Sequence, residues 1–343
     1  MNISEDINSK KYYLNIQILR MMLSLFILIF HFSVINNYSS QIIKLIIEPV
    51  SFYLATFFII SFYFSYNIIA SRNIYKIKQR FKRILISYII WPIIFFIINN
   101  LGYHVFGRKN KIQIKQFIFQ LLIGNGFYCY FWFQFNLIII LLLFIIIIFI
   151  FKNKYLIVFK LLAIFCCFLL NSFYYNKLYS QYNDIISFSI GKIPNTYIYS
   201  LTGFYLSSIN FLHIIKKHKK KAFFISFSIL YWLKKNILII KTVPLLRCLI
   251  LDIGAVNLFN IFSILPFDNI KNNKFIYIVK KITSHTGGIF YLHPKVIKFV
   301  SSILKKIKYL NLFTCIIDYL LTYFICACGS KLFIKSNLKY LFN

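Results

Sequence analysis

Acidic residues are the scarcest side chains in this sequence. Only 7 Asp and Glu residues stand against 40 Lys and Arg in 343 residues, and charged residues of both signs make up 14% of the chain. Typical globular domains carry about 25% charged residues. This shortage of charge, together with a hydrophobic content of 60% in long apolar runs, excludes an ordinary soluble protein and indicates an integral membrane protein.

The net charge of +33 has two possible explanations. A nucleic-acid-binding surface would require a soluble basic module, and no soluble segment is long enough, so we expect no nucleic-acid partner. Loops that face anionic lipid head groups and follow the positive-inside rule explain the charge better. Membrane lipids are therefore the expected partners of the basic connectors.

The sequence also lacks a pattern of metal ligands. Its seven cysteines fall mostly within apolar runs, form no CxxC pair and have no metal-binding spacing with histidine, so we predict no metal site. Neither a repeat nor a soluble appendage is evident, and residues 1–343 are predicted to form one membrane domain. The polar start and the length of the first apolar run favour a retained first helix over a cleaved signal peptide.

The apolar runs predict an all-α, polytopic membrane protein with about ten transmembrane helices. A further stretch that ends near Phe127 is short and carries three glutamines, which favours an interfacial or re-entrant helix. The predicted spans cover about residues 18–35, 49–70, 84–101, 131–151, 155–174, 193–211, 222–241, 243–265, 287–304 and 310–333.

The connectors between these spans differ in their content of Lys and Arg. Ten spans place both termini on one side, and the connectors on that side are the more basic set, including 71–83 and 214–221. The positive-inside rule then predicts that both termini are cytoplasmic, in a protein of the plasma membrane.

Arg20 and His31 lie within the first apolar run. On a helix they would be roughly 16 Å apart along the axis, about half of a hydrocarbon core of about 30 Å. Polar and ionisable groups are costly at that depth and are candidates for function. The alternatives are a cation that snorkels to the head groups for Arg20 and a helix-packing hydrogen bond for His31.

Arg80 and Arg83 stand in the basic connector after the second run. Three residues apart on a helix, they share a face, and guanidinium groups bind phosphate bidentately. The alternative is a plain basic loop on the cytoplasmic side.

His293 is followed by Pro294, which biases the histidine away from helical backbone. The pattern indicates either a broken helix that lines a cavity or a helix that begins here with Pro294 in its first turn. Trp132 and Phe133, at the start of the fourth run, are also typical of an aromatic belt at the membrane interface.

The order of these features resembles the acyltransferase 3 family of integral membrane acyltransferases, over essentially the whole chain. The most specific features are the Arg20–His31 spacing and the Tyr-Leu-His-Pro motif that contains His293. The sequence from Phe57 to Ser61, the Trp132-Phe133 pair and Gly203 support the resemblance by position.

The resemblance implies a ten-helix domain that transfers an acyl group, commonly acetyl from cytoplasmic acetyl-CoA or another acyl-CoA, to a hydroxyl of a glycan or lipid-linked sugar. It implies that His31 is the essential first-helix histidine and Arg20 its arginine. Arg80 or Arg83 matches the basic position after the second helix, and His293 matches the late histidine. A histidine base suits this reaction at neutral pH. A histidine that transiently carries the acyl group is the alternative role for His31.

One position departs from the family pattern. Family members usually have glycine after the serine of the second-helix motif, whereas this chain has Phe62 after Ser61. That ring would narrow the cavity or simply repack it, and a non-catalytic family member is one alternative. A transporter or flippase of lipid-linked glycans is another. Asp252 and Asp318 are the carboxylates well inside predicted spans, where either could orient a histidine or pair with Arg247.

Overall fold

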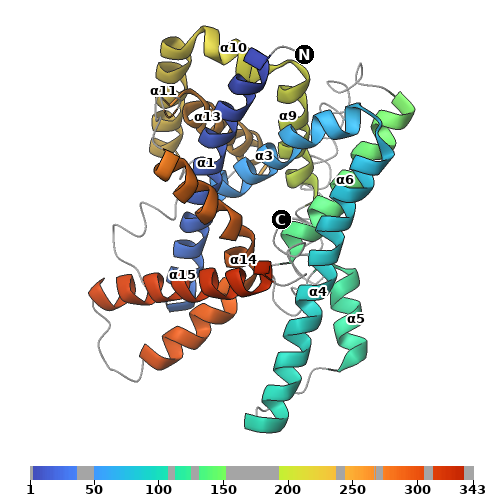
Figure 1. Ribbon diagram of the computed structural model, residues 1–343, viewed down its shortest axis with the longest axis vertical. Helices are drawn as coiled ribbons and strands as arrows, with labels where there is room; N and C mark the ends of the chain where they lie inside the picture. Colours follow the sequence, from blue (N-terminus) through green and yellow to red (C-terminus); the bar gives the residue numbers. More distant parts are fainter. Residues whose placement is uncertain are drawn as a thin grey trace. The chain divides into compact units, whose positions relative to one another are not determined.

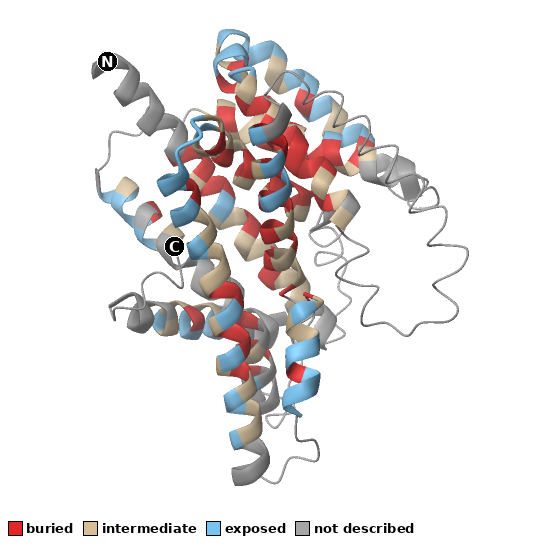
Figure 2. Ribbon diagram, turned by 90° about the vertical axis from the view of Figure 1, so that its right-hand side faces the viewer, coloured by how far each residue is buried: buried red, intermediate tan, exposed pale blue. Residues whose placement is uncertain are grey.

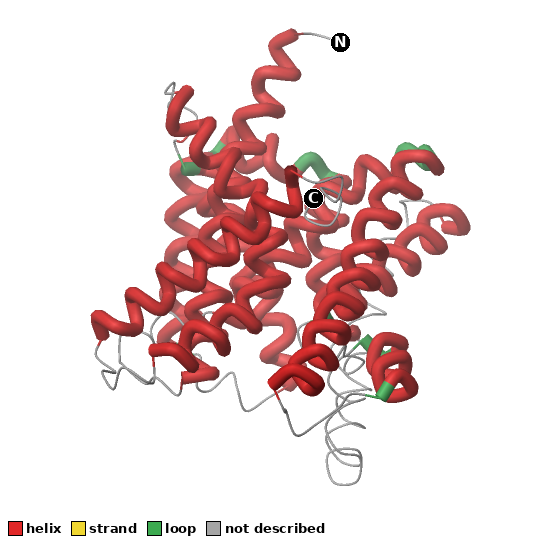
Figure 3. The backbone as a smooth tube through the Cα atoms, turned by 60° about the horizontal axis from the view of Figure 1, so that its bottom comes forward, coloured by secondary structure: helices red, strands yellow, loops and turns green. Residues whose placement is uncertain are grey.

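The computed structural model of the protein describes residues 3–36, 50–106, 113–124, 131–151, 193–236, 244–265, 267, 273–304 and 312–335. Across these ranges the regular elements are helices, without a strand (Figure 3). The predicted all-α fold is confirmed. The predicted fifth span, 155–174, lies outside the described residues.

The helices follow the predicted apolar runs. In chain order they are α1 (Ile3–Asn36), α3 (Val50–Ala70), α4 (Ile74–Phe106), α5 (Ile114–Leu122), α6 (Trp132–Phe151), α9 (Ile193–Ser208), α10 (Phe211–Lys217), α11 (Lys219–Lys235), α13 (Pro244–Ile264), α14 (Asn273–Leu304) and α15 (Leu312–Lys335).

Several of these helices are long and apolar enough to cross a bilayer, which makes this an integral multi-pass membrane protein. Four candidate spans cover Leu14–His31, Phe52–Ala70, Ile74–Leu101 and Trp132–Phe149. The interrupted pair α9 and α10 provides a fifth among the described residues. The predicted count of ten spans remains a prediction.

Two helices extend well beyond their apolar runs. α1 begins at Ile3 rather than near residue 18, and α4 begins at Ile74 rather than near residue 84. Hydropathy detects only the membrane-embedded part of a helix, while residues 3–17 and 74–83 contain no glycine or proline to end one. The basic connector that carries Arg80 and Arg83 is therefore mostly helical.

α5 matches the predicted short helix before the fourth span. Its nine residues extend about 14 Å, which is too short to cross a bilayer. Gly124 ends the helix with a φ of 78°, and its N–H donates to the Leu121 carbonyl at 3.2 Å. Glycine adopts this left-handed conformation at helix ends without steric cost.

The contacts divide the chain into two compact units. The first comprises Met1–Phe57, Leu212–Leu238 and Ile250–Asn343. Its centre is α1 packed against α14, with α15 packed on α14 (Figure 1).

The directions of these three helices follow from which residues meet. Ile18 and Val279 share one buried cluster, and His31 meets His293 farther along both helices, so α1 and α14 run parallel. α15 runs antiparallel to α14, because Tyr319 packs against Ile297 while Gly329 lies beside Leu292.

The second unit comprises Phe58–Phe211 and Ile239–Leu249. Phe144 of α6 forms its aromatic centre, with ring centroids 4.8 Å from Phe204 and 5.7 Å from Tyr197 of α9. Asn136 and Thr196 hydrogen-bond between the earlier parts of the same two helices at 3.3 Å, so α6 and α9 run parallel.

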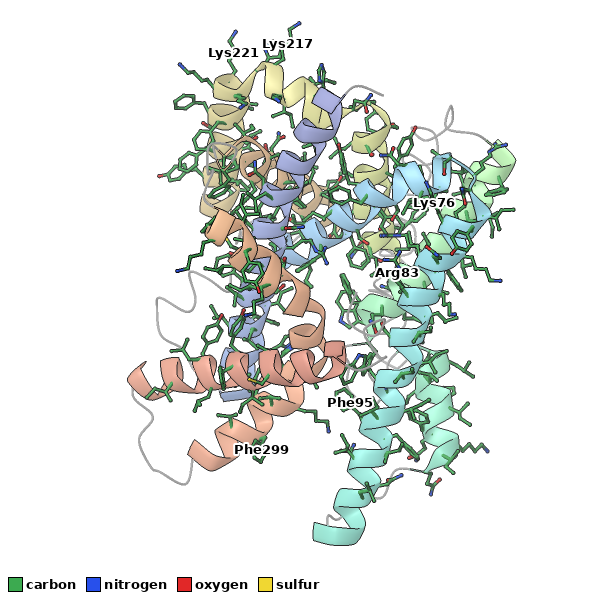
Figure 4. All side chains as sticks on the ribbon, viewed as in Figure 1. Lys76, Arg83, Phe95, Lys217, Lys221 and Phe299 are labelled. Atoms are coloured by element: carbon green, nitrogen blue, oxygen red, sulfur yellow. The ribbon has the colours of Figure 1, made fainter. Side chains whose placement is uncertain are left out.

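Within each unit, buried residues lie where helices pack against one another, and exposed residues lie on the outward helix faces (Figure 2). The outer face of α11 is apolar, with Phe224, Phe227 and Trp232 exposed. An apolar exposed face is expected where a helix meets lipid. Lys217 and Lys221 mark the basic turn between α10 and α11, where their side chains point outward (Figure 4).

Candidate active site

His31 of α1 and His293 of α14 lie next to each other inside the first unit, although they are 262 positions apart in the sequence. Their ring centroids are 5.0 Å apart, with an angle of 40° between the ring planes. His293 is 2% exposed and His31 is half-buried. The edge of the Phe30 ring, 5.2 Å from His31, adds an apolar wall. The structure thus brings together the two histidines that the sequence singled out.

The local backbone around His293 differs from both predictions. α14 runs continuously from Asn273 to Leu304, so the helix neither breaks nor begins at His293 and Pro294. Proline within a helix removes one hydrogen bond and usually bends the helix, and the ribbon of α14 changes direction along its length (Figure 1). Packing of α14 against α1 and α15 compensates for this local cost and keeps His293 on a helical turn.

Arg20 lies on the same face of α1 as His31. Eleven residues rotate the chain by three turns and about 20°, and they separate the two positions by about 16 Å along the axis. The Arg20 side chain is exposed, and its carbonyl oxygen accepts a hydrogen bond from Ser24 Oγ at 2.7 Å. The structure therefore does not bring Arg20 to the histidine pair. Arg20 and His31 instead lie about 16 Å apart on one stripe along the same face of α1.

A small cluster adjoins the histidine pair. Leu28 and Ile297 are buried against each other, and Tyr319 and Tyr323 of α15 pack on them. Sequence reasoning missed these tyrosines. The signal that could have found them is their spacing of four residues on α15, which places two phenols on one face.

The second unit gathers the other predicted motif residues. Phe58 of α3 lies with its ring centroid 4.6 Å from that of Phe133 and 6.4 Å from that of Trp132, at the start of α6. Arg80 of α4 donates from Nη2 to the carbonyl oxygen of Ser61 at 2.8 Å and to its Oγ at 3.2 Å. The serine of the second-helix motif and Arg80 of the connector are therefore direct partners.

Arg80 and Arg83 differ in environment although they are one turn apart. Arg80 is half-buried and bound to Ser61, whereas Arg83 is exposed on the surface of α4 (Figure 4). Arg72, in the turn before α4, is also held by the protein, because it donates to the Ile148 carbonyl at 3.1 Å and lies over the Phe149 ring. Arg83 is thus the more accessible guanidinium of the predicted pair.

The start of α4 is a cationic surface. Lys76, Lys78 and Lys82 are exposed together with Arg83, and residues 49–183 contain no Asp or Glu. No carboxylate from this long stretch can neutralise these side chains. Guanidinium and ammonium groups exposed in this way suit the binding of phosphate groups.

Phe62 occupies the position where the family usually has glycine. Its side chain is 1% exposed and meets the Phe144 ring edge to face, with centroids 5.0 Å apart. The ring therefore forms part of the aromatic core among α3, α6 and α9. Of the two effects predicted for this residue, repacking is the one that the structure shows.

Gly203 lies where α9 comes closest to α3. A Cβ atom at this position would stand 2.2 Å from the carbonyl oxygen of Ile59, which is backbone and cannot rotate away. Only glycine allows the two helices to approach this closely, as in other membrane helix pairs.

Of the two predicted carboxylates, the structure describes the side chain of one. Asp252 is buried on α13, whereas the side chains of Asp318 and Arg247 lie outside what the structure describes. In the described portion of the chain, no three His, Cys, Asp or Glu side chains gather as metal ligands would.

Comparison with known proteins agrees with the predicted resemblance. The sequence profile of the acyltransferase 3 family, described as an acyltransferase domain, matches residues 13–333. No curated protein and no solved structure matches the chain. Because the profile covers nearly the whole chain, from before Arg20 to beyond His293, the protein belongs to the acyltransferase 3 family of membrane acyltransferases.

Proposed function

We propose that this acyltransferase moves an acyl group, most simply acetyl, from acyl-CoA to a hydroxyl of a glycan or lipid-linked sugar. The observation that carries the proposal is the pair of His31 and His293, with ring centroids 5.0 Å apart, His293 buried and His31 half-buried. Two titratable rings at one buried place in a membrane protein are expected where protons are moved during a reaction.

In this proposal His31 is the general base. Its imidazole takes the proton of the acceptor hydroxyl while that oxygen attacks the thioester carbonyl carbon. The tetrahedral intermediate collapses as the carbon–sulfur bond breaks, and the imidazolium returns the proton to the CoA sulfur. Base catalysis of this kind contributes about 10²–10⁴-fold. His293 holds the ring of His31 in its reactive position.

Arg80 and Arg83 are proposed to bind the phosphates of acyl-CoA. The cationic start of α4, with Arg83 and three lysines exposed, supports this role. Arg80 anchors the surface to Ser61, and Arg83 offers its guanidinium to the ligand. Arg20 is proposed to hold the charged part of a substrate along the stripe that leads to His31.

The directions of the helices support the proposed topology of ten alternating spans in the plasma membrane, with both termini cytoplasmic. The parallel pair α1 and α14 would be spans one and nine, and the antiparallel α15 would be span ten. The parallel pair α6 and α9 would be spans four and six. Each pair has the relative direction that alternation requires.

The proposal is tested with labelled acetyl-CoA and membranes that contain the protein and its native glycans. Label that appears in glycan, and is released as acetate by mild base, supports O-acyl transfer. If no label is transferred while lipid-linked glycan crosses the membrane, the protein is a transporter instead. Membranes from cells without the protein provide the control.

A further inference from the structure

We propose that Tyr319 and Tyr323 of α15 form the oxyanion hole of the reaction, by donating phenolic hydrogen bonds to the oxygen of the acyl carbonyl. This inference rests on the proposed acyl transfer at the histidine pair.

The position of the two tyrosines follows from their packing partners. Both pack against Leu28 and Ile297. Leu28 precedes His31 by three residues and Ile297 follows His293 by four, so each lies one helical turn from a histidine on the same helix face. Because α1 and α14 run parallel, Leu28 lies about one turn before the level of the histidine pair and Ile297 about one turn after it. The cluster that contains both residues, with the two tyrosines packed on it, therefore spans the level of the histidine pair.

α15 buries polar side chains and exposes apolar ones, the opposite of a helix on the surface of a soluble protein. Tyr319, Thr322, Tyr323 and Cys326 follow the spacing of one helix face, and Thr322 and Cys326 are fully buried. Leu320, Leu321, Phe324 and Ile325 are exposed. The hydroxyl-bearing face thus points into the protein and the apolar face points out, as expected where polar groups line a functional interior in a membrane.

The chemistry of the site requires hydrogen-bond donors that the histidines do not provide. When a hydroxyl attacks a thioester, negative charge develops on the carbonyl oxygen, and donors aimed at that oxygen stabilise the transition state. In many enzymes backbone N–H groups donate these hydrogen bonds to the oxygen. Here both histidines lie within continuous helices, where backbone N–H groups already bond to carbonyls of the preceding turn. The backbone of α1 and α14 beside the histidines therefore offers no free donor, and the described side chains that can donate on the adjoining cluster are the phenols of Tyr319 and Tyr323.

Phenylalanine substitutions separate this role from packing, because they keep the ring and remove only the hydroxyl. We expect Tyr319→Phe and Tyr323→Phe, in the full-length protein in lipid nanodiscs, each to lower kcat for acetyl transfer by about 10²–10³-fold. The KM for acetyl-CoA and the thermal unfolding temperature should stay unchanged. Tyr277→Phe is the matched control, since Tyr277 is an exposed tyrosine on α14 and its variant should match the wild type.

Two results would overturn the inference. One is a double Phe variant whose kcat lies within twofold of the wild type while His31→Ala is inactive; the other is a change in acceptor KM alone, which would mean substrate binding rather than stabilisation of the oxyanion. Both leave the proposed function intact. Failure of the wild-type protein to transfer any acyl group would instead refute the proposed function.

Discussion

His31 and His293 show how a site in this protein depends on single side chains that are far apart in sequence. Their ring centroids are 5.0 Å apart, so each ring is a direct neighbour of the other, and replacing either one changes the surroundings of its partner.

Arg80 and Arg83 should respond differently to replacement by lysine. Arg80→Lys keeps the charge but loses the guanidinium that contacts both Ser61 oxygens. Hydrogen bonds to charged groups contribute about 1.5–3 kcal/mol, which corresponds to roughly 10–100-fold in acyl transfer or donor binding. We expect Arg83→Lys to raise the KM for acyl-CoA only a few-fold. Steady-state kinetics of both variants test this difference, and equal effects would contradict the assignment.

Phe62 should behave as a core residue. Phe62→Ala removes the ring that packs on Phe144, and large-to-small substitutions of buried phenylalanine cost roughly 3–5 kcal/mol. We predict a clear fall in the thermal unfolding temperature, measured in detergent, without any gain in transfer activity. Phe299→Ala is the control, because Phe299 is exposed on α14 (Figure 4). A Phe62→Ala variant that is as stable as the wild type, or more active, would show that the ring instead blocks a cavity.

The sequence predicted both histidines, but not their partners. Arg20 and His31 could be recognised because ionisable groups stand out in an apolar run. Tyr319 and Tyr323 were harder to recognise, because tyrosine is abundant in this chain, with 26 copies, and a spacing of four residues is a weak signal among so many. The pairing of Arg80 with Ser61 was also missed, since two residues 19 positions apart reveal no contact until two helices pack.

Glycines allow some helices of this protein to approach closely. At Gly203 the backbone of α9 lies directly against the backbone of α3 at Ile59. The clash of a Cβ at Gly203 involves the backbone of Ile59, which can yield only if a whole helix moves. At Gly329 a Cβ would stand 3.0 Å from Leu292 Cδ1, the end of a flexible side chain.

These two glycines make a matched pair of variants. Gly203→Ala should lower the yield of folded protein and its thermal unfolding temperature strongly, because α9 must shift away from α3. Gly329→Ala should have little effect, because the leucine can change rotamer and alanine favours the helix by about 1 kcal/mol over glycine. Size-exclusion profiles and unfolding curves in detergent compare them. Equal stability of the two variants would contradict the close approach.

Helix positions were predicted well from hydropathy, and helix ends were not. The eighth predicted span, 243–265, corresponds to α13 at Pro244–Ile264. By contrast α14 begins at Asn273 instead of residue 287 and passes through Pro294. Hydropathy reports contact with lipid, so it does not detect polar helical extensions, and the preference of the residue before proline was overridden by packing on α1 and α15.

At the scale of the whole molecule, the direction of each helix determines which loops face the cytoplasm. In the proposed topology the basic turn at His218, between α10 and α11, is cytoplasmic, and Gly124 at the end of α5 lies on the opposite side. The positive charge around the His218 turn agrees with a cytoplasmic location, since Lys216, Lys217 and Lys219–Lys221 surround it.

Epitope insertion tests this topology. A short epitope inserted after Lys217 should be accessible to antibody in inverted membrane vesicles and protected in right-side-out vesicles. An epitope inserted after Gly124 should show the opposite pattern. If both epitopes appear on one side, the number of spans between them or the direction of α4 and α6 is wrong. Retained acyl transfer in each insertion variant confirms that it is folded.

The proposed role of His31 is tested most directly by one measurement, the transfer of labelled acetyl from acetyl-CoA to glycan by purified protein carrying His31→Ala. The matched control is His213→Ala, because His213 is an exposed histidine on α10. We predict that His31→Ala loses about 10²–10⁴-fold in rate while it keeps its expression and unfolding temperature, and that His213→Ala matches the wild type. Transfer by His31→Ala at the wild-type rate would contradict the account.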